Sequence, residues 1–144
     1  MVELKEITKV NFEDILNLTV SEQQKNFVSS VAYSLAQAWL YKTAYPFAIY
    51  ADEKVVGFIM LGYYEERKQY TLWKFLIDEQ HQNKGYGRKA LQLAVDYLIE
   101  TFQVNEIFTG VALGNETAKH LYTSIGFVAT GVIENNMEEL RYIC

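Results

Sequence analysis

The stretch QNKGYGRKA, residues 82–90, decides how the rest of this chain is interpreted. It places Gly85, Gly87 and three cations at the start of an apolar-periodic segment that predicts a helix over about 86–102. The N–H groups at a helix start attract anions, whereas the helix dipole disfavours cations there. A bound phosphate would reconcile the cations with the dipole. The alternative is a solvated helix start with surface cations.

Three kinds of phosphate-binding loop can be compared with this stretch. A Walker loop closes with Gly-Lys-Ser/Thr, whereas here Lys84 precedes Gly85 and no Ser or Thr follows. A dinucleotide loop, G-x-G-x-x-G/A, matches residues 85–90. However, it expects an acid at the end of the next strand, and Glu106 begins its strand. A third pattern, Gln/Arg-x-x-Gly-x-Gly/Ala, fits residues 82–87 at every specified position.

The segments around the loop predict an α+β layered domain. Strands expected at 46–51, 55–64 and 70–78 are joined by short charged turns, so they predict an antiparallel meander, which disfavours a parallel dinucleotide sheet. The other expected elements are strands at 2–7, 106–113, 127–134 and 137–144, and helices at 11–18, 27–42 and 115–126.

Length and charge narrow the function classes. The chain has 144 residues, which suits one domain spanning 1–144, and its formal net charge of −5 argues against binding nucleic acid or an anionic membrane. The single cysteine, Cys144, allows no internal disulfide and no metal-ligand spacing, which favours a cytoplasmic protein without a metal. The sequence has neither a signal-peptide pattern nor an apolar run long enough for a membrane span.

A second motif, NETAKHLYTSIGF, follows at residues 115–127. Asn115 and Tyr122 are seven residues apart, so they lie nearly on one helix face about 10.5 Å apart along the axis. Ala118 lies between them on the same side and leaves room for a ligand. Taken singly, a capping asparagine and a core tyrosine would explain these residues equally well.

Taken together, the loop at 82–87 and the pattern Asn-x-x-Ala-x-x-x-Tyr-x-x-x-Gly-Phe at 115–127 resemble the two cofactor segments of the GNAT acetyltransferases. The resemblance covers the chain from about residue 46 to its end. It implies a mixed, largely antiparallel central sheet flanked by helices, with acetyl-CoA as cosubstrate. It also implies direct attack of an amine on the thioester, with Tyr122 as general acid.

The resemblance further assigns cofactor contacts. Strand residues would offer main-chain groups to the pantetheine arm, the loop would hold the pyrophosphate, and the second helix would contact the arm. These residues are Phe75, Leu76, Ile77, Gln82, Asn83, Lys84, Gly85, Tyr86, Gly87, Arg88, Asn115, Ala118 and Lys119.

The stretch at 70–91 looks closest to the bacterial diamine/spermidine/spermine acetyltransferases, which implies a primary amine acceptor, namely a polyamine. Glu65, Glu66 and Trp73 are the candidate acceptor residues, although the two glutamates could simply form a charged turn. Trp73 stands where some of these enzymes carry a glutamate base, so that base cannot be carried over. Ser124 stands where many carry a basic residue, for which Lys119 could compensate.

Other functions stay open at this point. The acceptor could instead be an amino acid, a peptide N-terminus or an aminoglycoside. A non-catalytic acyl-CoA sensor is the other alternative, and Tyr122 argues against it because binding alone needs no phenol there. Pairing of the last strands between two subunits could form a homodimer.

Overall fold

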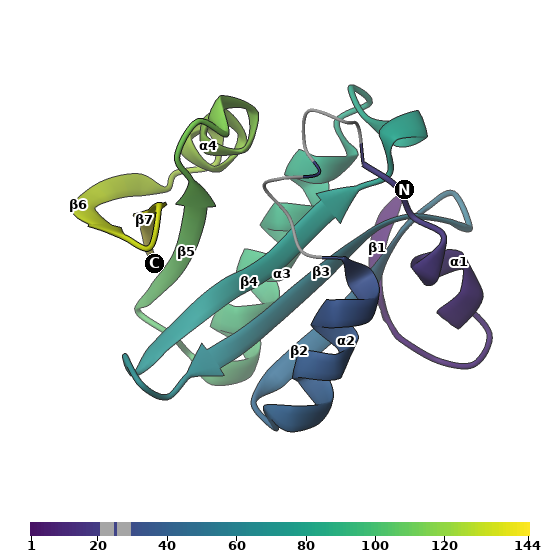
Figure 1. The fold of residues 1–144 in the computed structure, drawn as a ribbon, viewed down its shortest axis with the longest axis horizontal. Coiled ribbons are helices and arrows are strands. Elements are labelled where there is room, and N and C mark those ends of the chain that lie inside the picture. The colour runs from purple at the N-terminus through teal and green to yellow at the C-terminus, as the bar shows by residue number, and fades with distance from the viewer. Residues whose placement is uncertain (21–24, 26–29) are drawn as a thin grey trace.

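The structure, a computed structural model, describes residues 1–20, 25 and 30–144, which are built around one sheet (Figure 1). Its strands are β1 Val2–Glu6, β2 Ala44–Ala51, β3 Lys54–Tyr64, β4 Gln69–Ile77, β5 Glu106–Ala112, β6 Val128–Glu134 and β7 Met137–Ile143. Its helices are α1 Phe12–Leu16, α2 Val31–Leu40, α3 Tyr86–Phe102 and α4 Glu116–Ser124, with a 3₁₀ turn η1 at Glu79–His81. No helix within these described residues is long and apolar enough to cross a membrane.

The strands follow the order β1-β2-β3-β4-β5-β7-β6, and every neighbouring pair is antiparallel except β4 and β5. This arrangement confirms the predicted α+β class, the mixed, largely antiparallel sheet and the β2-β3-β4 meander. Local sequence explains two of the hairpins. Asp52 and Glu53, and likewise Asn135 and Asn136, have positive φ at both turn positions, as type I′ hairpin turns require.

Helices cover both faces of the sheet, with α2 in front and α3 behind in the view of Figure 1. α3 occupies the predicted range 86–102 and buries one apolar face, made of Ala90, Leu91, Ala94, Val95 and Leu98. On the opposite face, Ile15 of α1 and Val31 of α2 are buried against Phe58 and Leu76 of the sheet. The sheet therefore lies between two apolar layers, which fixes β4 from both sides.

α2 is shorter than the helix expected at 27–42. It starts after Ser30, whose side chain accepts a hydrogen bond from the Tyr33 N–H, and it ends before Tyr41, which is extended. Residues 27–29 lie outside the described residues. Trp39 lies on the same apolar helical period as Val31 and Ser34, yet it is 76% exposed. Eight residues from Val31 amount to a rotation of about 80°, so Trp39 lies beside the packed face, where Lys42 covers its ring.

β4 and β5 pair over two residues and then diverge. The register pairs are Thr71 with Phe108 and Leu72 with Thr109. Figure 1 shows β5 turning away from β4 towards α4 beyond that point. The register of β4 against β3 also shifts there, because Met60 opposes Lys74 while Leu61 opposes Leu72, which leaves Trp73 as a bulge residue.

Candidate active site

A cavity of about 380 Å³ occupies the space between the diverging strands. Its walls come mainly from β4, β5 and the α4 segment, and β4 is remote in the sequence from the other two. Residues of the two strands that line it include Trp73, Lys74, Phe75, Leu76, Thr109, Gly110, Val111 and Ala112, and Asn115, Ala118 and Tyr122 line it from the α4 segment. The structure therefore brings Phe75 and Leu76 together with Asn115, Ala118 and Tyr122, whereas the predicted residues Ile77 and Lys119 are not among the lining residues.

The bulge at Trp73 decides which main-chain groups of β4 face this cavity. Beyond it, the carbonyl of Leu76 lies towards β3, because it comes within 2.5 Å of where a Cβ on Gly57 would stand. Peptide groups of a strand alternate between its two edges, so those of Phe75 and Ile77 face the open edge. Of the three strand residues predicted to offer main-chain groups, Leu76 therefore has its carbonyl on the β3 side, although the residue also lines the cavity.

The loop before α3 has the backbone shape of an anion site. Asn83 and Gly85 have positive φ, and Gly85 caps α3 without any side-chain hydrogen bond to the first turn. The first N–H groups of a helix have no partner within it. Successive N–H groups around residues in the left-handed region form concave anion-binding nests. The residues present therefore fit the pyrophosphate of acetyl-CoA.

Side chains brace this loop against both neighbouring elements. The Gln82 side-chain amide donates to the Ile77 carbonyl at 3.0 Å, which ties the loop to the end of β4. The Arg88 guanidinium donates to the Ser124 carbonyl at 3.3 Å, at the end of α4. A Cβ on Gly87 would lie 3.2 Å from Phe75 and 3.3 Å from Leu121, so glycine allows α3 to start close to both. Lys84 and Gly85 are exposed beside them.

The second motif forms α4 as predicted. Asn115 is buried and caps the helix, because its side-chain oxygen accepts from the Ala118 N–H at 3.3 Å. Asn115, Ala118 and Tyr122 share the cavity-facing side. Lys119 lies elsewhere on the helix and forms an ion pair with Glu138 of β7 at 2.8 Å, which raises the pKa of its ammonium group.

Tyr122 is enclosed by aromatic rings. Phe75 and Phe127 contact its ring edge-on, with centroids 6.3 Å and 5.3 Å away. Burial raises the pKa of its phenol to about 12, although a hydrogen bond with Thr109 opposes that effect. The phenol therefore stays protonated across the physiological range and can act as a hydrogen-bond donor.

A second cavity of about 470 Å³ adjoins the first on the α2 side. The two share Trp73, Lys74, Thr109, Gly110 and Met137. Trp73 packs edge-on against Tyr41 with ring centroids 5.4 Å apart. The predicted acceptor residues Glu66 and Trp73 both line this second cavity, whereas Glu65 is not among its lining residues.

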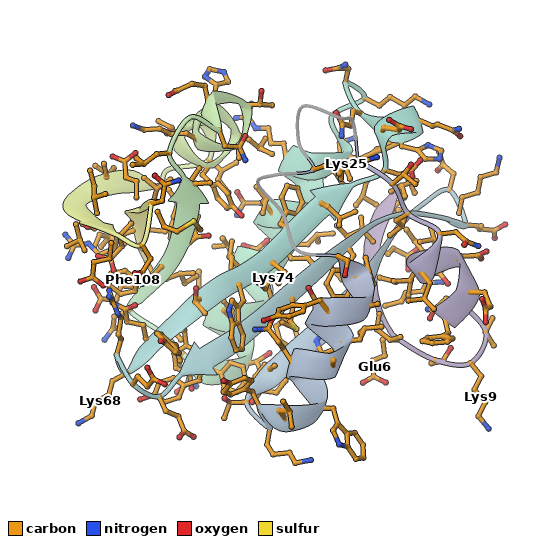
Figure 2. The ribbon with its side chains drawn as sticks, viewed as in Figure 1. Glu6, Lys9, Lys25, Lys68, Lys74 and Phe108 are labelled. Carbon is orange, nitrogen blue, oxygen red and sulfur yellow. The ribbon has the colours of Figure 1, made fainter. Side chains whose placement is uncertain are left out.

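Sequence reasoning missed several residues of this second cavity. Lys74 lies on the α2 side of β4 (Figure 2), with its ammonium 5.8 Å from the centre of the Tyr33 ring, and burial lowers its pKa. Glu134, Glu138 and Glu139 come from the β6–β7 hairpin. The two adjacent glutamates at the start of β7 are visible in the sequence and could have indicated an acidic site. The sequence did not show that the β6–β7 hairpin lies near β4, because that depends on the order of the strands in the sheet.

The chain matches the Acetyltransferase (GNAT) family over residues 12–127. Spermine/spermidine N(1)-acetyltransferase of Bacillus subtilis (strain 168) is 31% identical over 145 residues, covering 96% of this chain and 95% of that protein.

Two solved structures of spermidine N-acetyltransferase from Vibrio cholerae share the fold. The complex with CoA and spermine has a TM-score of 0.76 at 20% identity, covering 99% of this chain and 95% of that one. The dodecameric structure in an intermediate state has a TM-score of 0.72 at 19% identity, covering 99% and 93%.

Proposed function

The chain belongs to the GNAT acetyltransferase family and is an acetyl-CoA-dependent N-acetyltransferase, and we propose that its acceptor is a polyamine such as spermidine or spermine. The observation that carries this proposal is the acidic cavity that adjoins the cleft between β4 and β5. A polyamine has one reacting amine and further cationic amines along its chain. It therefore suits a site in which a reaction cleft continues into an acidic cavity.

The charges lining the second cavity favour a polycation. Four glutamates line it, against two basic residues, Arg67 and Lys74, and the glutamates are Glu66, Glu134, Glu138 and Glu139. Arg67 forms ion pairs with Glu134 and Glu139, and Glu66 accepts from the Tyr64 hydroxyl at 2.9 Å. Even with these internal contacts, carboxylates outnumber cations around the cavity. The substrate names of the Bacillus subtilis relative support the same acceptor class.

The proposed chemistry assigns one task to each wall of the cleft. The open edge of β4 at Phe75 and Ile77 holds the pantetheine arm and the acetyl carbonyl, and Asn115 contacts the arm. The N–H groups of residues 83–88 hold the pyrophosphate, with the cations of the loop nearby. Acetyl-CoA supplies the activated acyl group. Because the amine attacks the thioester directly, no covalent acyl-enzyme intermediate forms and no cysteine nucleophile is required, which agrees with a sequence whose single cysteine is Cys144.

Tyr122 is the proposed general acid. Its phenol donates a hydrogen bond to the sulfur as the thiolate leaves, which stabilises the negative charge that develops there. A free thiol has a pKa of about 8.5, well below the value of about 12 for Tyr122. Tyr122 therefore acts mainly as a hydrogen-bond donor to the thiolate. The C–N bond forms as the C–S bond breaks, the nitrogen releases one proton to solvent, and the thiolate gains its proton from solvent afterwards.

Release of free thiol from acetyl-CoA across an amine panel tests the acceptor. We expect kcat/KM for spermine and spermidine to exceed that for amino acids, peptide N-termini and aminoglycosides by about tenfold or more, equivalent to about 1.4 kcal/mol. The double variant Glu66→Gln, Glu139→Gln should raise KM for spermine without changing KM for acetyl-CoA, whereas Glu100→Gln on the exposed face of α3 should change neither. A preference for another amine would overturn the polyamine acceptor, and CoA binding without turnover would favour a sensor.

We also propose that the chain forms a homo-oligomer through β6. This strand is an edge of the sheet and exposes apolar side chains at Val128, Val132 and Ile133. An exposed apolar edge strand tends to pair with another chain. Light scattering should give at least about twice the 16.7 kDa of one chain, and a monomer at micromolar concentration would contradict this proposal.

A further inference from the structure

Arg67 connects the β3–β4 turn to the β6–β7 hairpin at the second cavity. Its guanidinium forms an ion pair with Glu134 through Nη2, and another with Glu139 through Nη1 at 3.4 Å. All three residues line the second cavity. A cation of the protein itself therefore occupies two of the carboxylates that would bind a distal ammonium group of a polyamine.

The Glu139 carboxylate is held in place by other contacts besides Arg67. The Thr130 hydroxyl on β6 donates to its Oε1 at 2.8 Å, and the Gln69 side-chain amide on β4 donates to its Oε2 at 3.4 Å. Both donors are uncharged, so they orient the carboxylate without neutralising it. If Arg67 moves away, Glu139 keeps its position, and its negative charge becomes available to an incoming ammonium group.

The ion pairs of Arg67 lie where water reaches them. The side chains of Arg67 and Glu134 are 37% and 55% exposed, whereas that of Glu139 is 16% exposed. Exposed ion pairs contribute little net free energy, because water screens the charges and two long side chains must be ordered to form them. An ammonium group of the substrate can therefore exchange with the guanidinium at little cost.

We propose that Arg67 is a specificity-determining residue that competes with a distal ammonium group of the acceptor for Glu134 and Glu139. This inference rests on the polyamine acceptor proposed above. When the polyamine binds, the guanidinium leaves the two carboxylates for solvent and the ammonium group takes its place. A guanidinium that stayed would repel the ammonium group, because both carry positive charge. An amine without a distal cation undergoes no such exchange, so Arg67 raises KM for polyamines alone.

The test compares Arg67→Gln, which removes the charge, with Arg67→Lys, which keeps it. Arg67→Gln should lower KM for spermine about threefold, the size of effect that exposed ion pairs produce. KM for n-butylamine, which has the reacting amine alone, should change less than about 1.5-fold, and Arg67→Lys should keep KM for spermine within about 1.5-fold of the wild type. Thermal unfolding of both variants would report any loss of folded protein.

Lys68→Gln is the matched control, because it removes the same charge from the same turn. The Lys68 side chain is exposed and extends away from the molecule (Figure 2), and Lys68 is not among the residues that line the second cavity. Lys68→Gln should leave KM for spermine unchanged. An equal fall in KM with Lys68→Gln and Arg67→Gln would mean that net charge alone is responsible, which would overturn the proposal.

The sign of the change in KM separates competition from a structural role. If Arg67 only braces the hairpin, Arg67→Gln would loosen Glu134 and Glu139 and raise KM for spermine, or leave it unchanged, and either result would overturn the proposal. A double-mutant cycle gives a second check, because Arg67→Gln should have no effect on KM for spermine in a Glu134→Gln, Glu139→Gln background.

Failure of the acceptor proposal would look different. A wild-type enzyme that prefers polyamines, beside an Arg67→Gln enzyme with an unchanged KM for spermine, would overturn the role of Arg67 alone. If neither enzyme acetylated spermine faster than n-butylamine, the polyamine acceptor and the role of Arg67 would both be overturned.

Discussion

Tyr122→Phe is expected to lower kcat for acetylation of spermine by about a hundredfold, at the lower end of the effect of removing a general acid. The substitution removes the hydroxyl and leaves a ring of the same shape between Phe75 and Phe127. Packing should therefore be retained, while the leaving thiolate loses its hydrogen-bond donor. Binding of CoA, measured by calorimetry, should change little, because the loop and the β4 edge are untouched.

The kinetics must be limited by chemistry for this result to be decisive. Single-turnover measurements at saturating acetyl-CoA separate acetyl transfer from product release. Tyr142→Phe is a matched control, since this tyrosine also packs against Phe127 but does not line the cleft cavity. Because burial raises the pKa of Tyr122 to about 12, the phenol should not ionise below about pH 10. Wild-type turnover by Tyr122→Phe under these conditions would rule out the assigned role.

The sequence was sufficient for features that depend on local spacing. Helix α3 was predicted from its apolar period, and the turns of the meander from charged residues between β-rich runs. The shared face of Asn115, Ala118 and Tyr122 followed from helical geometry alone. These features are set by residues within one or two helical turns or one hairpin. The local sequence pattern alone was therefore enough to predict them.

Features that depend on pairing between distant segments were not predictable. The bulge at Trp73 arises from the register of β4 against β3, and it turns the peptide groups of Phe75 and Ile77 to the open edge. The contact between Thr109 and Leu72 requires β5 to pair in parallel with β4. Because α3 and a loop separate these strands in the sequence, their pairing could not be inferred from sequence adjacency. Strand spacing alone specifies neither the register nor the order of the strands.

The position of Trp39 shows a different limit. A helical period indicates which residues share a face, but the width of the buried stripe depends on how the helix sits on the sheet. Trp39 lies at the margin of the face that contains Val31 and Ser34, and it remained exposed. Among the described residues of α2, only Val31 and Ser34 are buried, and Leu35 and Ala38 are partly buried.

Gly57 illustrates how a residue outside the cavity sets the shape of the cleft. It lies in β3 opposite Ile77, at the end of β4 that borders the cavity. A Cβ on Gly57 would stand 2.5 Å from the Leu76 carbonyl oxygen, 2.9 Å from the Ile77 side chain and 3.2 Å from Ile49. The nearest of these atoms is backbone, so a larger residue cannot be accommodated by a change of rotamer. β4 would have to move.

Gly57→Ala is therefore expected to reduce the free energy of unfolding by about 2 kcal/mol, within the range for overpacking a well-packed interior. Gly110→Ala in β5 is the matched control, because a Cβ there would meet only the Met137 side chain, at 3.4 Å or more. Without a clash, replacing a strand glycine by alanine should be neutral or stabilise by up to about 1 kcal/mol. Urea unfolding measures both variants. Because β4 also carries the open edge at Phe75 and Ile77, KM for acetyl-CoA should rise more in Gly57→Ala than KM for the amine. Equal stability of the two variants would show that β4 can shift to accommodate the added Cβ at little cost in free energy. Gly57 would then not set the position of the strand.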